Sequence, residues 1–277
     1  ANKQLRLVAE LVDIPITAGT CDPLNVVGKD IAMDISSAAH VFPHAPPGLE
    51  RFKGFYAGDR KEYIKLVVLQ LRCGKICLSD RCRGGGTIFP VSKAGGARQR
   101  EVWHGSRVSA AARRPPRPRH LASPTAFKGI HVRRGRRLRV SKRDGRCFVD
   151  QLRLPVSLRP FLGRPSVTRE ELKDCGVTES EFTSFVAPNT CPGAERYWPL
   201  SCVWGMGFFW SSYVAQETLL AVCDAAGLSE NLIVSCDAPT PSDMSLAFSL
   251  ATDDVMFFSD AGGHVTSKAA AALERAM

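Results

Sequence analysis

The sequence predicts an α+β fold in which antiparallel strands are flanked by helices. Three observations indicate this class. Two apolar runs, 246–250 and 255–258, have the length and composition of a buried hairpin. A second hairpin is indicated over 87–103, where two short segments surround a glycine-bearing turn. Residues 61–71 place apolar side chains three and four positions apart, which is the spacing of an amphipathic helix.

The first half of the chain supplies a helix and a basic hairpin. Residues 1–60 carry no clear periodic signal and are left unassigned. The helix over 61–71 precedes the strands 87–92 and 98–103, which Ala94-Gly95-Gly96-Ala97 connects. Three cations lie at or near the tip of this hairpin: Lys93, Arg98 and Arg100. Residues 110–119 are rich in arginine and proline and predict an extended connector, because proline lacks the backbone donor of a regular element.

The second half predicts a strand, an insertion, a long helix and the apolar hairpin. A short strand over 138–140 leads toward Asp144, and residues 160–188 read as an inserted helical loop in which Thr168 opens a capping box. A helix of about four turns begins at Ser211 and ends near Gly227. After the apolar hairpin, alanine-rich residues 267–276 predict a last helix.

Composition excludes several classes of protein. The chain has 277 residues, of which 44% are hydrophobic and 23% charged, as in ordinary globular proteins. No apolar run reaches the roughly 18 residues that a membrane span needs, and the N-terminal residues have no signal-peptide core. The ten cysteines form no repeating framework and are expected to be reduced thiols. The sequence therefore predicts an intracellular protein with no membrane partner, and it does not distinguish the nucleus from other compartments.

The net charge of +10 is concentrated in one segment. Residues 93–146 contain 17 Lys and Arg against 2 Asp and Glu, whereas residues 147–277 contain 8 against 16. A basic block of this kind indicates a polyanion partner, because cations placed on phosphates release condensed counterions. A solvated basic linker is the alternative interpretation.

Two adjacent carboxylates, Asp253 and Asp254, are expected at the tip of the apolar hairpin. Neighbouring carboxylates repel each other, and a divalent cation compensates them well. A polar turn without a cation is the alternative, since Asp is common in turns. Asp144, at the end of another predicted strand, would favour the cation, because two-metal phosphoryl transfer uses a few Asp residues to hold two ions.

These residues carry a resemblance to a known family. Four motifs occur in order: Phe89-Pro90-Val91-Ser92-Lys93-Ala94-Gly95-Gly96-Ala97-Arg98-Gln99-Arg100, Asp144 with Gln151-Leu152-Arg153-Leu154-Pro155, Gly205-Met206-Gly207-Phe208, and Thr252-Asp253-Asp254-Val255. Together they resemble the fingers and palm of the reverse transcriptases of retroelements, over about residues 85–275. The fold that this resemblance implies is a polymerase palm with an antiparallel sheet and flanking helices, preceded by basic fingers.

The resemblance implies an RNA-directed DNA polymerase that transfers a nucleotide from a dNTP to the 3′ hydroxyl of a primer on an RNA or DNA template. Asp144 and Asp253 would bind two Mg²⁺ or Mn²⁺ ions, with Asp254 beside them. The resemblance further implies nucleotide contacts from these residues: Lys93, Arg98 and Arg100 on the triphosphate, Val149 near the sugar, and Met206, Gly207 and Phe208 near the base pair. The basic block would hold template and primer.

The resemblance also divides the chain. Residues 1–60 form an unassigned extension, 61–143 a fingers-like region with the basic connector, and 144–277 a palm-like region with an insertion over about 160–190. No thumb is expected within the chain.

Departures from the family keep alternatives open. Ala251 stands where the family has tyrosine, and a shift of one residue would put Phe148 in place of Val149. Asp150 is the alternative to Asp144 as the metal ligand. A nucleic-acid-binding remnant without polymerase activity is the alternative function, and a Mg²⁺-dependent nuclease is a third.

Overall fold

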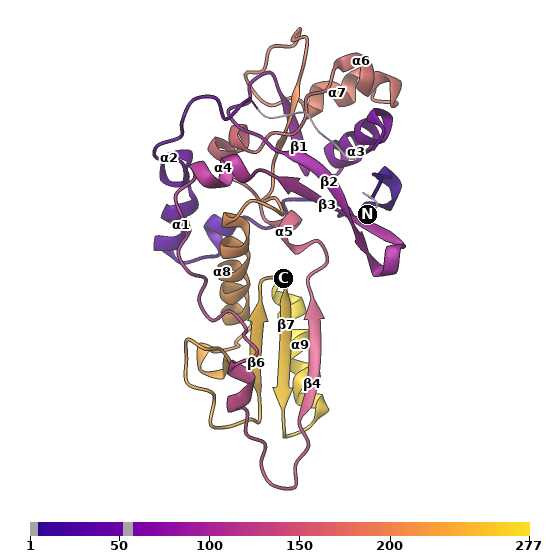
Figure 1. Cartoon of the computed structure of the whole chain (residues 1–277). Coiled ribbons are helices and arrows are strands. Elements are labelled where there is room, and N and C mark those ends of the chain that lie inside the picture. Colours follow the sequence, from indigo (N-terminus) through magenta and orange to yellow (C-terminus); the bar gives the residue numbers. More distant parts are fainter. Residues whose placement is uncertain (1–4, 52–57) are drawn as a thin grey trace. The chain divides into compact units, whose positions relative to one another are not determined.

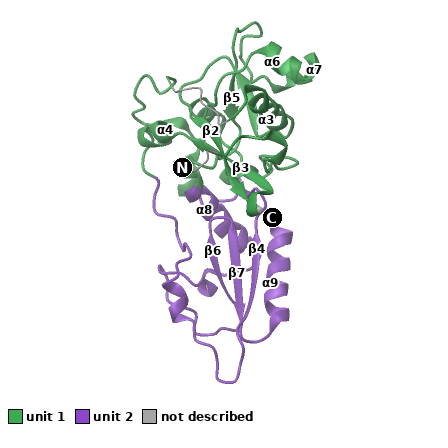
Figure 2. Ribbon diagram, turned by 45° about the vertical axis from the view of Figure 1, so that its right-hand side comes forward, with its two compact units in different colours: residues 1–24, 30–114, 149–211 green, residues 25–29, 115–148, 212–277 purple. Residues whose placement is uncertain are grey.

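A computed structural model, which describes residues 5–51 and 58–277, shows a mixed α/β protein with small antiparallel sheets and several helices (Figure 1). The chain forms two compact units, each discontinuous in sequence (Figure 2). Unit 1 contains residues 1–24, 30–114 and 149–211, and unit 2 contains residues 25–29, 115–148 and 212–277. These units group residues by contact rather than by motif order, so they differ from the three consecutive ranges expected from the sequence, and that division stays a prediction.

Unit 1 is built on two antiparallel strand pairs. β1 (Ile76–Ser79) pairs with β5 (Trp198–Ser201), and β2 (Thr87–Lys93) pairs with β3 (Arg98–His104). Seven helices lie wholly or mainly in this unit: α1 (Lys29–Ile35), α2 (Ala38–Val41), α3 (Arg60–Arg72), α4 (Ser106–Ala111), α5 (Phe148–Gln151), α6 (Arg169–Asp174) and α7 (Glu179–Phe185).

The predicted basic hairpin and the helix before it are both confirmed. α3 buries the apolar stripe that its spacing predicted, and the Asp59 side chain caps it by accepting a hydrogen bond from the Lys61 N–H. The β2–β3 pair continues to Lys93 opposite Arg98, with Gly95 at a positive φ of 66° in the connection. Glycine adopts this conformation without steric cost, which explains why the turn forms here.

The inserted segment is helical, as predicted. Thr168 and Thr178 each complete a capping box, with Glu171 and Glu181 respectively. Each box satisfies two backbone donors at the first turn of a short helix. The first box is the one that the sequence indicated, and the second repeats it ten residues later.

A buried ionic cluster connects three parts of unit 1. The Lys75 Nζ atom lies 3.0 Å from Glu101 Oε2 and 3.1 Å from Asp150 Oδ2, and Arg164 Nε lies 3.1 Å from Glu101 Oε1. Gln70 also donates a hydrogen bond to Glu101. Burial alone would raise the pKa of Glu101, but Lys75 and Arg164 outweigh it and hold that pKa at about 2. The ion pairs of Glu101 therefore stabilise unit 1 at pH values above the ordinary pKa of glutamate. This stabilisation is lost as the pH falls toward 2.

Unit 2 contains a three-stranded antiparallel sheet in the order β4-β7-β6. β4 (Arg139–Asp144) pairs with β7 (Asp254–Ser259), which pairs with β6 (Ala247–Ala251). β6 and β7 are the predicted apolar hairpin, and β4 is the predicted short strand, extended to Asp144. The sequence did not show that β4 adds to this hairpin, which is a pairing across more than a hundred residues.

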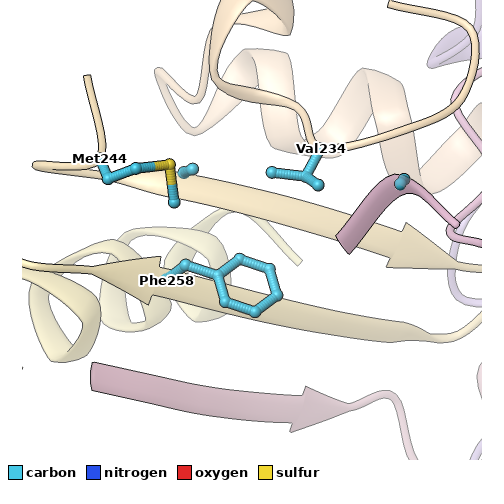
Figure 3. Close-up of a cluster of buried hydrophobic side chains, with 5 residues drawn as sticks. Val234, Met244 and Phe258 are labelled. Atoms are coloured by element: carbon cyan, nitrogen blue, oxygen red, sulfur yellow. The ribbon is translucent and has the colours of Figure 1, made fainter. Parts of the chain in front are cut away.

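Helix α9 (Gly263–Ala276) contacts β4 and β7. A hydrophobic cluster on the sheet consists of Ala126, Val234, Met244, Ala247 and Phe258, three of which are labelled in Figure 3. Because successive side chains of a strand point to opposite faces, Phe257 and Val255 of β7 point away from the face that Phe258 occupies. Both faces of the short sheet therefore bury apolar side chains.

The long helix predicted from Ser211 is α8 (Trp210–Ala225), and Gly227 follows it with a φ of 79°, as a C-terminal cap requires. α9 begins at Gly263, four residues before the predicted start, because its first turn lacks the alanines that identified the rest. Residues 112–119 of the predicted connector contain no helix or strand, but its first two residues are helical, because α4 extends to Ala111 before the prolines begin.

Among the residues described, none of the helices combines the length and apolar character needed to cross a bilayer. All ten cysteines fall within the described ranges, and each is a free thiol.

Replacing Lys75 by methionine tests the buried ionic cluster. Lys75→Met removes a cation from two carboxylates while leaving them in place, and we expect a loss of about 3 kcal/mol in the free energy of unfolding of the protein, measured with urea. Lys173→Met, at an exposed position of α6, is the control and should change it by less than about 0.5 kcal/mol. Equal losses in the two variants would contradict the role given to Lys75.

Candidate functional site

The three predicted aspartates of unit 2 meet at one end of the sheet. Asp144, the last residue of β4, is the register partner of Asp254, the first residue of β7. Asp253 lies in the two-residue turn between β6 and β7. Cα atoms of directly opposed residues in antiparallel strands are about 4.5–5.5 Å apart, so the side chains of Asp144 and Asp254 share one face at close range.

The backbone ties the end of β4 to this turn. The Gly145 N–H donates to the Asp253 carbonyl oxygen at 2.9 Å. Thr252 has a φ of 61°, which is uncommon for a β-branched residue and costs about 1–3 kcal/mol. Such strain persists only where neighbouring contacts fix the conformation, and here it positions Asp253.

Gln216 of α8 provides such a contact. Its Oε1 atom accepts the Thr252 N–H at 2.9 Å, while its Nε2 atom donates to the Arg119 carbonyl at 3.0 Å. The side chain is fully buried, so both ends of the amide are used. Gln216 was not predicted; it begins a polar run, Gln216-Glu217-Thr218, between the apolar positions of α8.

A cation compensates the carboxylates within unit 2. Directly opposed like charges destabilise a strand pair, and Lys142 Nζ lies 2.8 Å from Asp254 Oδ2. A hydrogen bond to Asp254 raises the pKa of Lys142, which keeps the ammonium charged. Lys142 was also missed, although it precedes Asp144 by two residues on the same strand and therefore shares its face. The other Asp254 oxygen, Oδ1, is buried without a hydrogen-bond partner among the described residues.

Asp144 and Asp253 line the same pocket, which has a volume of about 240 Å³. Its polar wall also includes Arg143 and Arg146, and Arg143 is ion-paired with Glu274 of α9. Val255 and the α8 and α9 residues Leu219 and Leu273 form its apolar side. The pocket thus combines three carboxylates, those of Asp144, Asp253 and Glu274, with two guanidinium groups on a partly apolar base.

The donor set suits a hard divalent cation held partly by its substrate. Within residues 5–51 and 58–277, no group of three or more His, Cys, Asp or Glu side chains is arranged to hold a metal. Mg²⁺ is commonly bound by one or two carboxylates together with substrate phosphates rather than by a complete protein cage. Asp144 and Asp253 fit that arrangement, and the unpaired Oδ1 atom of Asp254 is a further oxygen donor at the same end of the sheet.

The predicted phosphate-binding cations lie in unit 1, and two of them are already paired. Lys93 Nζ lies 2.6 Å from Asp13 Oδ2, and Arg98 Nη1 lies 2.9 Å from Asp13 Oδ1. Asp13 is nearly buried, with 7% of its side chain exposed. Arg100, opposite Val91 in the hairpin, makes no ion pair within the part of the chain that the structure describes. A triphosphate would therefore compete with Asp13 for two of the three cations.

The glycine motif is explained by packing within unit 1. Gly207 has a φ of 109°, and a Cβ atom there would overlap the carbonyl oxygen of Trp103. Met206 accepts a hydrogen bond from the Trp103 N–H at 3.2 Å and is half-buried. Phe208 is 1% exposed and stacks on Trp204 in the core, so its contact with a base pair stays a prediction.

The structure also separates the two candidate metal aspartates. Asp150 binds Lys75 in the ionic cluster of unit 1 and is neither a solvent-facing residue nor part of the pocket that Asp144 lines. Val149, the predicted sugar neighbour, is 7% exposed, as is Phe148, the residue that a shifted register would use.

Neither the models of known protein families nor the curated proteins contain a match to this chain.

Gly207→Ala tests why glycine is needed in the motif. Because the added Cβ would meet backbone and the φ is positive, we expect the free energy of unfolding to fall by at least about 2 kcal/mol without any ligand present. Gly205→Ala is the matched control, since its Cβ would meet only ordinary contacts. If Gly207→Ala unfolded like the wild type, close approach of a nucleotide would become the better explanation.

Replacing Lys142 tests the aspartate cluster as a cation site. Lys142→Met removes a positive charge beside the carboxylates, and we expect Mn²⁺ to bind about fivefold more tightly, corresponding to about 1 kcal/mol, in a titration followed by electron paramagnetic resonance. Lys268→Met, an exposed lysine of α9, controls for net charge. Asp144→Asn should abolish the binding, and equal Mn²⁺ affinities in the two lysine variants would argue against the site.

Proposed function

We propose that this chain is a reverse transcriptase-like nucleotidyltransferase of retroelement origin, an RNA-directed DNA polymerase that adds a dNTP to a primer 3′ hydroxyl. One observation carries the proposal: the pairing of β4 with β7 brings Asp144 opposite Asp254 and beside the turn that carries Asp253. Asp144 is far in the sequence from the adjacent Asp253 and Asp254, and it belongs to a separate motif of the resemblance.

The arrangement of elements supports a polymerase palm as the fold of unit 2. Asp144 ends β4, and helix α8 follows later in the chain. Asp253 and Asp254 lie in the β6–β7 hairpin, which belongs to the same sheet as β4. A nuclease could use the same carboxylates, but it would give no reason for the ordered basic motif around Lys93 and Arg100.

Asp144 and Asp253 would hold Mg²⁺, or Mn²⁺, together with phosphate oxygens of the nucleotide. When bound, two such ions supply activation of the attacking hydroxyl and stabilisation of the leaving pyrophosphate. The protein's own contribution is positional. The strained turn fixes Asp253, Gln216 holds that turn, and Lys142 offsets the charge of Asp254.

The remaining site residues keep the roles that the resemblance implies. Lys93, Arg98 and Arg100 are proposed to contact the triphosphate, where guanidinium and ammonium groups offset the charge of the β and γ phosphates. Met206, Gly207 and Val149 are proposed to contribute to the nucleotide pocket. The substrates are a dNTP and an RNA or DNA template with its primer.

A binding remnant without polymerase activity is the second candidate, and a specific observation favours it. Asp13 is ion-paired with both Lys93 and Arg98, and Lys142 is ion-paired with Asp254, so several charges that a polymerase directs at its substrate have partners within the protein. Ala251 also replaces the family's tyrosine beside the aspartate turn.

Primer extension distinguishes these candidates. The wild type should extend a primer on RNA and DNA templates with Mg²⁺ or Mn²⁺, and Asp253→Ala with Asp254→Ala should lower the rate by about a thousandfold or more, because several kcal/mol of charge stabilisation are removed. Glu170→Ala with Asp174→Ala removes the same charge from α6 and should extend normally. Salt-sensitive nucleic-acid binding without extension by the wild type would favour the remnant, and cutting of the strands would favour a nuclease.

A further inference from the structure

Ion pairs divide the basic block into neutralised and available cations. Within residues 93–146, at least eight cations are ion-paired with an acidic side chain: Lys93, Arg98, Arg113, Arg117, Arg119, Arg133, Lys142 and Arg143. The high charge of this segment therefore overstates the positive surface that it offers to a partner.

Four arginines near the start of β4 are different. Arg134, Arg136, Arg137 and Arg139 are exposed and form no ion pair within the described ranges. The sequence contains no Asp or Glu between Glu101 and Asp144, so no acidic neighbour along the chain offsets them. They form the densest group of unneutralised cations in the basic block.

A defined turn presents these side chains. The Arg136 N–H donates to the Arg133 carbonyl at 3.0 Å, and Gly135 has a φ of 76° with open space around it. We call residues 133–139 the arginine turn. Its tip projects into solvent, since nothing lies within 4 Å of a Cβ built on Gly135.

Arg133 fixes the base of the arginine turn. Its guanidinium forms a two-point ion pair with Asp260, with Nε 2.7 Å from Oδ2, and its backbone N–H donates to the same oxygen at 3.2 Å. The Asp260 side chain is fully buried. Breaking this pair would leave a buried charge without a partner, so the turn is held at its base while its other arginines remain free.

The arginine turn is separate from the carboxylate pocket. β4 begins at Arg139 and ends at Asp144, and five residue steps of about 3.4 Å separate them by about 17 Å. This distance corresponds to about five nucleotide steps along one strand of B-form duplex. A polyanion bound at the turn would therefore lie outside the immediate reach of the aspartates.

We propose that the arginine turn binds the phosphate backbone of a nucleic acid, independently of sequence, as an accessory surface of unit 2. Guanidinium groups contact phosphate oxygens through two parallel hydrogen bonds, which favours arginine over lysine at such surfaces. The turn has no aromatic side chain for base stacking and no helix whose apolar face could insert into a lipid surface. This inference goes beyond the proposed reaction because it requires neither the aspartates nor a metal.

The test measures binding of a labelled 20-base-pair DNA duplex and a 20-nucleotide RNA by fluorescence anisotropy between 50 and 200 mM KCl, with EDTA and without dNTP. Arg134→Gln, Arg136→Gln and Arg137→Gln together should reduce the slope of log affinity against log salt by about 2 to 3 on the duplex, and weaken binding at least about tenfold at the lowest salt. Replacing the same three arginines by lysine should retain most of the slope.

The matched control replaces three exposed arginines that are already ion-paired and lie outside the basic block: Arg51→Gln, Arg72→Gln and Arg169→Gln. It lowers net charge equally and should change the slope by less than about 1. Equal slopes in the two glutamine triples would overturn the proposal, as would loss of binding to phosphatidylserine vesicles with nucleic-acid binding unchanged.

Repeating the titration with Asp253→Ala and Asp254→Ala separates this inference from the proposed function. Binding that depends on the arginine turn should persist in that variant. The two proposals can therefore fail separately. Absence of primer extension would contradict the polymerase function but not nucleic-acid binding by the arginine turn, and the reverse also holds.

Discussion

The pairing of β4 with β7 is the constraint on which the candidate site depends. It places two carboxylates directly opposite each other at a strand end, an arrangement that is unfavourable unless positive charge is nearby. Lys142 supplies that charge from within the protein, and a divalent cation would supply it more strongly. The surrounding parts maintain the arrangement: α9 covers the sheet, Gln216 secures the turn, and the strained Thr252 fixes the path of the chain.

The sequence predicted those elements whose signal is local. The hairpins, α3, α8 and the Thr168 capping box each follow from spacing or from one turn, and the structure confirms them. Pairings between distant segments were not predictable, because nothing near β4 specifies β7 as its neighbour. The same limit explains why the partners Asp13 and Asp260 were missed, since each acts on cations 80 or more residues away. Residues 1–60 gave no prediction, and the helices α1 and α2, which lie in the described part of this range, are too short to show a period.

The cations of the basic block have two different roles, depending on whether they are ion-paired within the protein. Where arginine and lysine form ion pairs with buried carboxylates, as at Asp13 and Asp260, they hold loops and strands in place. These cations contribute little positive electrostatic potential to the protein surface. Where the cations form no ion pair among the described residues, as at Arg134, Arg136, Arg137 and Arg139, they keep their counterions and can exchange them for phosphates. Net charge counts both kinds of cation alike. The contacts of each side chain distinguish cations that are ion-paired within the protein from cations that are available to bind a partner.

The wide separation of β4 and β7 along the chain has a consequence for how the protein folds. During synthesis from the N-terminus, β4 leaves the ribosome long before its partner, and Asp144 can meet the aspartate hairpin only after about a further hundred residues have been made. A sheet completed by so distant a contact closes slowly, and until then β4 is an unpaired edge. Its arginines and lysine then have a second use, since repulsion between like charges discourages two nascent chains from joining edge to edge.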